Sequence, residues 1–252
     1  MINPSRVQAQ IQNVPSYTAT KPSPHVSSRY GFVQTPDIVG LLQEQGYQMR
    51  NVRGGSRGSS RELGMHEVRM IKADVHNFGR GDVFPEIVIT NSHDRSSRAM
   101  LDLGFWRAAC DNGLVVSVEN NKNFQLTHLG DLKEQLTKAV GYLSEFAEMA
   151  SDKIEAFQNR RMTGIESEEF ITRAATLRGV RNTSDVGRAY RSEDSEDTLW
   201  LVYNRAQENL LKGRFKTKGV KNFKSGRPIT SVRRSLNLNK DLWKLAEEFL
   251  PS

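Results

Sequence analysis

Cysteine is almost absent from this chain, and its scarcity excludes several kinds of site. Cys110 is the only cysteine among 252 residues, so no disulfide can form within the chain. A chain without disulfides suits a reducing compartment. No histidine lies within fifteen residues of Cys110 on either side, whereas a catalytic thiol needs a base beside it. We therefore expect Cys110 to be a small packed side chain.

Long apolar runs and targeting signals are also lacking. No stretch reaches the roughly 20 apolar residues that cross a bilayer. Residues 1–4 begin no signal peptide. We expect no membrane partner and a cytoplasmic location, in the host cell if the protein is encoded by a phage.

The signatures of common enzyme sites are missing too. The sequence has no P-loop, dinucleotide fingerprint or nucleophile elbow, and its five histidines show no metal-ligand spacing. Asp82 and Glu86 precede a strand as in some nucleases, but residues 87–90 supply no lysine. The acidic cluster 193–197 lacks the spaced oxygens and glycine of a calcium loop, so we expect a capping turn there. We predict no catalytic residue, metal or cofactor, and a non-enzymatic protein.

The run Glu86–Val118 is expected to be the centre of the fold. Residues 87–89 are apolar, and in residues 99–106 Ala99, Leu101, Leu103 and Phe105 fall on one face. This period of two is typical of a strand with one face in the core. The turn at residues 111–113 supplies the positive φ angles of a tight hairpin, and residues 114–116 return from it. The run predicts three antiparallel strands.

The flanking segments extend this sheet and cover it. His66–Asp74 and Phe124–His128 are expected to add strands, and helices are expected from Thr35 and over Asp131–Arg161, Ile165–Leu177, Thr198–Leu211 and Lys240–Leu250. We predict an α+β fold, an antiparallel meander packed against a long helix with additional C-terminal helices. It would form a single domain over 30–252, with the sheet at about 64–128 and the helical part at about 131–252. A flexible arm over 1–29, rich in Gln, Ser, Pro, Thr and Asn, would precede it.

The long helix carries a heptad seam. Its apolar residues repeat at alternating steps of four and three, at Leu136, Val140, Leu143, Ala147, Ala150, Ile154 and Phe157. The seam either clamps the helix on the sheet or continues into a second helix or subunit. A homo-oligomer therefore stays among the alternatives.

The charge of the chain favours a polyanionic partner. Lys and Arg number 36 against 29 Asp and Glu, a net charge of +7. The excess is concentrated in Arg205–Arg234, which holds ten basic residues against the single acid Glu208. A second basic segment, Arg50–Arg61, is a Gly/Ser-rich loop with four arginines.

These two segments supply the candidate site. Lys and Arg on a pliable, glycine-containing backbone can follow phosphates, and interleaved aromatic rings can stack on unpaired bases. Proteins that read duplex DNA usually insert a helix into a groove, and the segment 205–234 is too rich in glycine for such a helix. Single-stranded nucleic acid is therefore the better partner, and we expect DNA rather than RNA. The predicted binding residues are Arg53, Arg57, Arg61, Lys212, Arg214, Phe215, Lys216, Lys218, Lys221, Phe223, Lys224 and Arg227.

Three motifs carry a resemblance to a known family. LGFWRAACDNGLVV at residues 103–116, a His-Leu-Gly at 128–130, and TLWLVYNRAQENLLKG at 198–213 occur in this order. They resemble a family of phage- and plasmid-encoded proteins known as a domain of unknown function. In this chain Trp200, Asn204 and Glu208 have the spacing of the Trp-x-x-x-Asn-x-x-x-Glu helix of that family. The resemblance covers roughly residues 30–250 and implies a mobile genetic element without an established activity.

The expected fold is also similar to the core of single-strand annealing recombinases of phages and eukaryotes, which bind DNA in a groove on oligomeric rings. We predict a phage-encoded, non-enzymatic single-stranded nucleic-acid-binding protein that acts in replication, recombination or transcription. The alternative is a protein-interaction module that binds and redirects a host or phage protein through the seam and the N-terminal arm.

Overall fold

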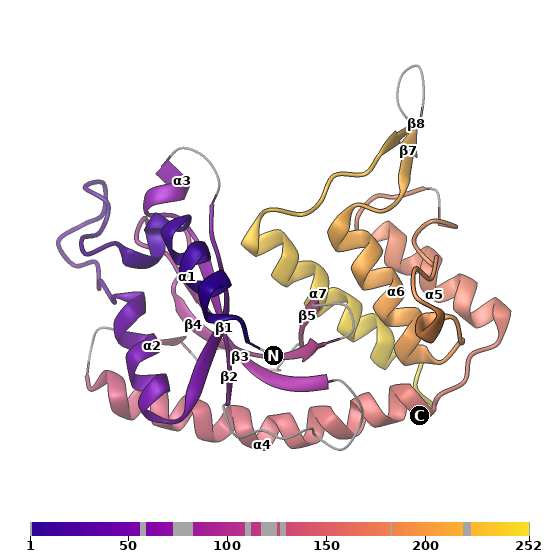
Figure 1. Ribbon diagram of the computed structural model, residues 1–252, viewed down its shortest axis with the longest axis horizontal. Helices are drawn as coiled ribbons and strands as arrows, with labels where there is room; N and C mark the ends of the chain where they lie inside the picture. The colour runs from indigo at the N-terminus through magenta and orange to yellow at the C-terminus, as the bar shows by residue number, and fades with distance from the viewer. Residues whose placement is uncertain are drawn as a thin grey trace. The chain divides into compact units, whose positions relative to one another are not determined.

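The computed structural model describes residues 2–55, 59–72, 83–108, 112–116, 125–126, 130–181, 183–218 and 223–251. The chain divides into two compact units (Figure 1). The sheet unit comprises Met1–Ala147 and Ser231–Arg233, and the helical unit comprises Glu148–Thr230 and Arg234–Ser252. Each unit is described by itself.

The sheet unit is built on an antiparallel sheet with the strand order β1-β2-β3-β4-β5, and β6 pairs with β4. Its strands are β1 Tyr47–Arg53, β2 His66–Lys72, β3 Val83–Asn91, β4 Ala99–Arg107, β5 Asn112–Val115 and β6 Gln125–Leu126. The predicted α+β class and antiparallel meander are confirmed. Strand β1 was not expected, because its arginines were assigned to a phosphate-binding loop.

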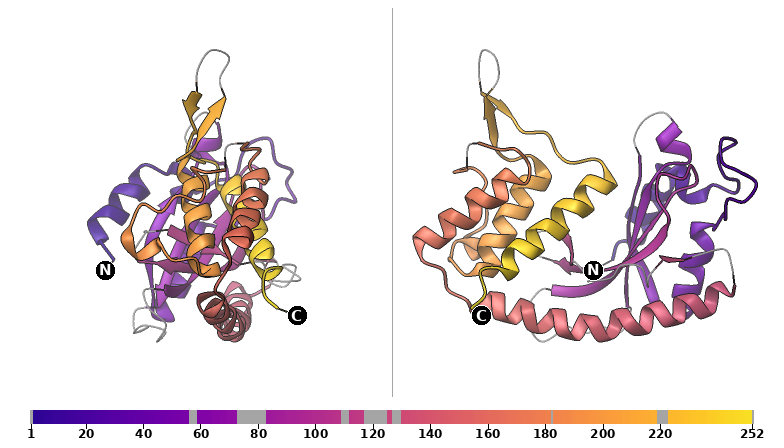
Figure 2. Two further views of the ribbon diagram at one scale, coloured as in Figure 1. Left: turned by 90° about the vertical axis from the view of Figure 1, so that its right-hand side faces the viewer. Right: turned by 180° about the vertical axis from the view of Figure 1, so that it is seen from behind.

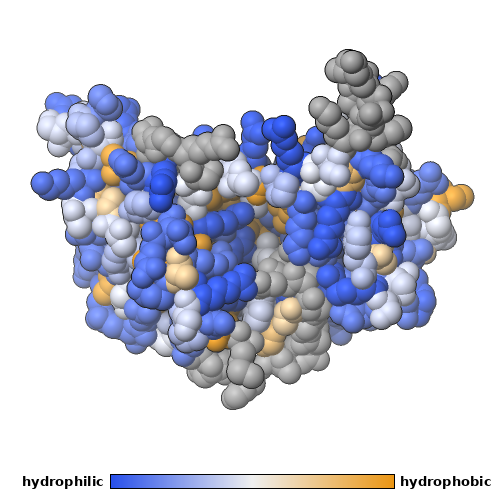
Figure 3. All heavy atoms as spheres, turned by 45° about the horizontal axis from the view of Figure 1, so that its top comes forward, coloured by the Kyte–Doolittle hydropathy of each residue, from blue (hydrophilic) through white to orange (hydrophobic). Residues whose placement is uncertain are grey.

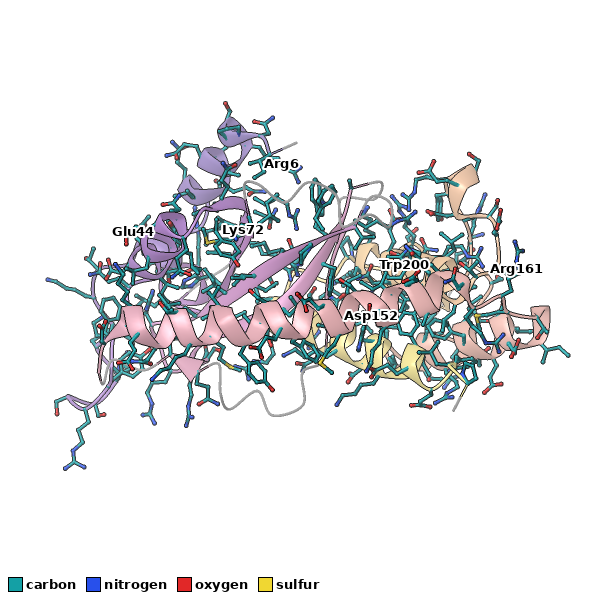
Figure 4. All side chains as sticks on the ribbon, turned by 90° about the horizontal axis from the view of Figure 1, so that it is seen from below. Arg6, Glu44, Lys72, Asp152, Arg161 and Trp200 are labelled. Atoms are coloured by element: carbon teal, nitrogen blue, oxygen red, sulfur yellow. The ribbon has the colours of Figure 1, made fainter. Side chains whose placement is uncertain are left out.

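Apolar side chains on one face of the sheet form its core. Val68 and Met70 of β2, Ile89 of β3 and Leu101 of β4 are fully buried. Helix α2, Thr35–Glu44, belongs to this unit and buries Ile38 and Leu42. The first half of the long helix α4, Leu132–Asn159, lies alongside the sheet (Figures 1 and 4). One face of the antiparallel sheet is thus packed against apolar side chains, as the period-two pattern predicts.

The other face of the same strands carries a buried ionic network. Arg69 donates through Nε to Glu67 Oε1 at 2.6 Å and through Nη1 to Glu86 Oε1. Arg53 forms a two-pronged pair with Glu67, at 2.9 and 2.8 Å. Arg50 sits in a β-bulge between Met49 and Asn51 and donates to Glu86 Oε2 from Nε and Nη2, at 3.0 and 2.7 Å. A bulge redirects a side chain, which explains how Arg50 reaches this face.

The network is almost closed to solvent. Glu67 is 0% exposed, Glu86 2% and Arg69 5%. Burial alone would raise the pKa of Glu67, but Arg53 and Arg69 lower it to about 2. Glu67 therefore stays ionised, and each of the two carboxylates has two guanidinium partners.

Two glycines of the 103–116 motif make room for this network. A Cβ on Gly113 would lie 1.8 Å from Arg69 Nη1 and 2.5 Å from Glu86 Oε1. A Cβ on Gly104 would lie 2.8 Å from Val88 Cγ2 and 2.9 Å from the Leu114 carbonyl oxygen. Gly113 lies in strand β5, so close packing, not a positive φ angle, requires a glycine there.

A neutral histidine pair lies at the end of strands β2 and β3. The ring centroids of His66 and His93 are 5.3 Å apart, and both residues are 0% exposed. Burial lowers the pKa of both, that of His66 to about 4. His66 Nδ1 lies 3.1 Å from the Gly64 carbonyl, which can only accept, so Nδ1 carries the proton and Nε2 accepts from Thr35 Oγ1 at 2.7 Å. The Thr35 hydroxyl therefore bonds to His66 and does not cap helix α2, whose N-cap is Gln34.

The N-terminal segment lies against the sheet. Composition predicts a flexible arm over 1–29, but residues 4–12 form helix α1, Pro4–Gln12, capped by the Asn3 side chain, and a 3-10 turn follows at Pro15–Thr18. Val7, Val14 and Tyr17 are buried, and Gln10 Oε1 accepts a hydrogen bond from the backbone of Val52 at 3.0 Å. A polar composition therefore does not prevent this segment from packing on strand β1.

The helical unit contains the second half of α4, a short 3-10 turn at Ser192–Asp194 and further helices and strands. They are α5 Gly164–Thr176, α6 Leu199–Lys212, the hairpin β7 Lys216–Lys218 and β8 Phe223–Ser225, and α7 Val232–Glu247, most of which belongs to this unit. Helix α7 begins eight residues before the predicted Lys240, so Arg233 and Arg234 lie in a helix. Trp243 packs on Phe157 and Tyr203, with centroid distances of 5.1 and 6.5 Å.

The heptad seam of α4 is buried within the chain. Six of its seven residues are no more than 6% exposed: Leu136, Leu143, Ala147, Ala150, Ile154 and Phe157. Each alternative describes one half of the seam: its first half belongs to the sheet unit, and in its second half, in the helical unit, Phe157 packs on Trp243 of helix α7. None of the described helices combines the length and apolar character of a membrane-spanning segment.

Replacing Arg69 by methionine is expected to destabilise the protein strongly. The substitution keeps a long side chain but leaves Glu67 and Glu86 each with one buried partner fewer. Breaking a buried ionic network in this way costs about 3–5 kcal/mol. Urea denaturation measures it. The exposed Arg61 of the same unit, changed to methionine, is the control and should shift stability by less than about 0.5 kcal/mol. Equal effects of the two substitutions would contradict the importance of the network.

Stability is expected to fall as the pH drops from 6.5 towards 4. A histidine with a lowered folded-state pKa binds its proton more readily when unfolded, so stability is complete above pH 6.5 and declines below it. From pH 7 to 5 the shift of His66 accounts for about 2 kcal/mol. Urea denaturation of His66→Gln should show a lower stability at pH 7 and a flatter pH profile. His25→Gln, at an exposed histidine, should leave the profile unchanged.

Candidate nucleic-acid interface

The base of the hairpin β7–β8 is fixed to the end of helix α6. Gly213 ends α6 in the left-handed conformation, with φ 70°, and its N–H bonds to the Asn209 carbonyl. A Cβ there would lie 2.6 Å from the Arg227 carbonyl carbon. Ile229 N donates to Leu211 O at 2.8 Å, and Gly226 N donates to Phe215 O at 2.7 Å. The glycines at the base of this basic segment serve close packing and not the flexibility expected of them.

Phe215 is not available to stack on a base. Its ring is 5% exposed and lies against Gly226, where a Cβ would come within 2.6 Å of Cε2. The guanidinium of Arg178 lies over the ring, 4.9 Å from its centroid. Arg178 also donates to the carbonyl oxygens of Leu210 and Arg227. The predicted stacking role of Phe215 is therefore wrong, and its ring anchors the hairpin.

Glu208 forms ion pairs with three basic side chains near the C-terminal end of α6. Its Oε1 accepts from Lys212 Nζ at 2.7 Å and from Arg214 Nη1 at 2.9 Å, and its Oε2 pairs with Arg191 Nη2 at 2.5 Å. Burial alone would raise the pKa of Glu208, but Arg191 and Lys212 lower it below its usual value. The side chains of Lys212 and Arg214 are still 39% and 34% exposed. Arg191 also pairs with Asp194, so three cations meet two carboxylates and the group keeps one net positive charge.

An exposed aromatic ring lies beside these cations. Tyr190 is 50% exposed, and the guanidinium groups of Arg214 and Arg188 lie 4.7 and 5.4 Å from its ring centroid. Such distances are typical of cation–π contacts. The sequence Arg188-Ala189-Tyr190-Arg191 was the available signal, but it lies outside the two segments richest in basic residues. Tyr190 was therefore missed.

The segment that carries Tyr190 is held by Asn209 of α6. Asn209 Nδ2 donates to the carbonyl oxygens of Val186 and Arg188, both at 2.9 Å. Asp185 Oδ2 accepts from the backbone N–H of Lys216 at 3.0 Å, which joins the segment to β7. Gly187 packs on Ile171 of α5, where a Cβ would lie 2.3 Å from Cδ1. These contacts place Tyr190 beside the base of the hairpin, which projects beyond α6 (Figure 2).

We call the group Arg188, Tyr190, Lys212, Arg214 and Lys216 the tyrosine platform. Arg188 and Lys216 are exposed, as is Arg227, which follows strand β8. Hydrophilic side chains predominate on the face of the helical unit seen in Figure 3. The platform combines one accessible ring with cations on two sequence segments, the combination that single-strand binding uses.

The other residues that were predicted to bind nucleic acid lie in different environments or outside the described residues. Arg53 lies in strand β1 and is paired with Glu67, so it is a structural residue. Arg61 is exposed in the short helix Ser59–Glu62. Arg57 and Lys221 lie outside the described residues, as do the side chains of Lys218, Phe223 and Lys224 and the whole of Cys110. The two basic segments belong to different units.

The acidic cluster at 193–197 contributes to ion pairs within the helical unit. Asp194 pairs with Arg191 at 2.5 Å, and Asp197 pairs with Arg205 at 2.5 Å. Arg205 Nη1 also donates to the Asp194 carbonyl at 2.8 Å. These contacts fold the cluster onto α6, in the manner of a capping turn, just before the N-cap Thr198.

The side chains of the Trp200-Asn204-Glu208 motif also make structural contacts within the helical unit. Trp200 is 3% exposed and stacks on Tyr203, with ring centroids 6.0 Å apart; Figure 4 shows it inside the helical unit. Asn204 Nδ2 donates to the Trp200 carbonyl at 2.7 Å. One turn further, Glu208 gathers the cations described above.

Comparisons with known proteins connect the chain to proteins without a described activity. The family described as a domain of unknown function (DUF932) matches residues 23–243. Two proteins of Escherichia coli (strain K12) are similar: UPF0380 protein YafZ, 28% identical over 248 residues, and UPF0380 protein YfjQ, 29% identical over 251 residues. Each match covers 94% of this chain and 88% of the relative. No solved structure matches the chain significantly.

Replacing Gly226 by alanine is expected to destabilise the helical unit. The new methyl group would overlap the Phe215 ring, and overpacking of this kind costs about 1–3 kcal/mol. Urea denaturation measures the change in the free energy of unfolding.

Gly141→Ala is the matched control. Gly141 lies exposed in α4, and a methyl group added there would meet nothing within 4 Å, so alanine should stabilise the helix by up to about 1 kcal/mol. If Gly226→Ala were also neutral or stabilising, the glycine would serve flexibility and not packing.

Proposed function

The chain belongs to the DUF932 family, and we propose that it is a non-enzymatic protein that binds single-stranded nucleic acid through the tyrosine platform. The observation that carries this proposal is the exposed ring of Tyr190 beside the guanidinium groups of Arg188 and Arg214. Bases of any sequence can stack on an aromatic ring or on a guanidinium plane. DNA is the favoured strand and RNA the competitor.

Electrostatics support an anionic partner at this surface. Glu208 is the acid that pairs with Lys212 and Arg214, and it is 3% exposed, so it presents little negative charge to solvent. Lys216 and Arg188 are exposed and add to the local field. Each phosphate that a cation neutralises releases bound counterions, which makes binding tighter at low salt.

The position of the arginines allows two kinds of contact with one strand. Arg214 reaches both the Tyr190 ring and Glu208, so it can turn its remaining donors towards a phosphate while the ring receives a base. Arg188 flanks the same ring from the other segment. A strand that passes over the platform would thus meet a stacking surface between cationic groups.

The alternative function, a protein-interaction module, has less support. The two surfaces expected to carry it were the α4 seam and the N-terminal arm. The seam is buried within the chain, and α1 lies against β1. A cytoplasmic location and a phage or plasmid origin remain part of the proposal and depend on the resemblance of residues 103–116 and 198–213.

Tyr190→Ala is expected to weaken single-strand binding. Loss of one stacked base costs about 1–3 kcal/mol, which is roughly five- to 150-fold in Kd. Fluorescence anisotropy with labelled DNA strands at several salt concentrations measures it, with duplex and RNA of the same sequence as competitors. Tyr190→Phe should bind like the original protein.

Arg214→Gln should weaken binding and reduce the salt slope by about 1.

Tyr142→Ala is the control, because Tyr142 is exposed to a similar degree, 43%, on helix α4. It should leave the affinity unchanged. Binding that hardly depends on salt, or an equal response to the two tyrosine substitutions, would reject the proposal. Capture of a stoichiometric protein from nuclease-treated lysate, with no strand binding, would favour the alternative.

A further inference from the structure

The sheet unit has a pocket whose lining, among the described residues, is basic and contains no acid. Its volume is about 600 Å³, and it is formed by residues between 27 and 33, by residues between 91 and 99, and by the two residues of strand β6. Arg29, Arg95 and Arg98 are among the lining residues, and neither Asp nor Glu is. Pockets of this size hold small molecules such as nucleotides.

Three neutral polar side chains of the pocket already donate hydrogen bonds within the protein. Tyr30 Oη donates to the Ser92 carbonyl at 2.8 Å. Asn91 Nδ2 donates to the Val33 carbonyl and to Thr35 Oγ1, at 2.9 and 3.0 Å. Ser97 Oγ donates to the Arg98 carbonyl at 3.0 Å. The charged donors of the lining are the guanidinium groups of its arginines.

The three arginines are not neutralised by carboxylates. Within the described part of the chain, no ion pair joins Arg29, Arg95 or Arg98 to Asp or Glu, and Arg98 Nη1 donates to the neutral Gln125 Oε1 at 2.6 Å. The nearby Asp94 does not line the pocket, and its Oδ1 accepts from Ser96 N at 2.9 Å. Three arginines that line one pocket offer several charged donors, which suits a phosphate because its oxygens accept several charged hydrogen bonds.

Arg95 is held at the pocket in an unfavourable backbone conformation. Its φ angle is 68°, in the left-handed region that an arginine rarely adopts. The turn is fixed on both sides by Ser92 Oγ, which accepts from Ser97 N and donates to Ser97 O, both at 2.8 Å. Glycine or asparagine would suit this position better, so the arginine side chain is the unexplained feature of the turn.

We propose that this pocket binds a phosphomonoester, either a free nucleotide or the 5′-phosphate of a strand. The phosphate would contact Arg29, Arg95 and Arg98. Val33, Ala99 and Leu126, which also line the pocket, give the remainder of the ligand an apolar surface. This site lies in the sheet unit and does not rest on the tyrosine platform of the helical unit.

Isothermal titration calorimetry of the full chain tests the proposal with five probes: inorganic phosphate, adenosine monophosphate, adenosine, a short oligonucleotide with a 5′-phosphate, and the same oligonucleotide with a 5′-hydroxyl. We expect binding of at least one phosphate-bearing organic probe and none of adenosine. Preference for the monophosphate identifies a free nucleotide, and preference for the 5′-phosphorylated over the 5′-hydroxyl strand identifies a strand end. Equal binding of adenosine and its monophosphate, or no binding of any phosphate-bearing probe, would overturn the proposal.

Two variants distinguish loss of ligand binding at this pocket from loss of folding. Arg95→Asn suits the left-handed conformation, so the midpoint of thermal unfolding should not fall, while affinity should drop about tenfold or more with the loss of one charged hydrogen bond. Arg61→Gln removes an arginine of the same unit that does not line the pocket, and it should bind normally. An unchanged affinity in Arg95→Asn would count against the pocket. Tyr190→Ala should leave mononucleotide binding intact, so the two proposals can fail separately.

Discussion

The fold of the sheet unit depends on the placement of Arg69 between Glu67 and Glu86. These three side chains are buried on one face of the sheet, and no one of them could be buried alone without a large desolvation cost. Arg50 and Arg53 complete the network from β1, which explains why an edge strand with so many arginines joins the sheet. Pairing of the charges therefore fixes which strand lies beside β2.

A related arrangement organises the helical unit. Glu208 is buried near the C-terminal end of α6 and holds Arg191, Lys212 and Arg214. Through Arg191 it also fixes the segment that carries Tyr190. In both units a buried carboxylate gathers arginines from separate segments. The difference is exposure: the cations on Glu208 remain accessible, whereas Arg69 does not.

Much of the fold could be predicted from the sequence, because period-two strands and helical stripes report directly on burial. Strands β2, β3 and β4 and the helices α4, α5 and α6 follow from these patterns. Strand β1 could not be recognised, since arginines that pair with distant glutamates look like a basic loop. For the same reason Phe215 looked accessible, and Tyr190 was not connected to Arg214, which is distant in sequence. Contacts across the fold decided these positions.

The division between the two units falls inside helices. One boundary lies between Ala147 and Glu148, within α4, and another between Arg233 and Arg234, within α7. Neither unit can be cut out at a loop, because a cut would leave helical turns without their hydrogen-bond partners and expose buried seam residues. Recombination between genes could not readily exchange one unit alone. This agrees with a family match that runs through both of them.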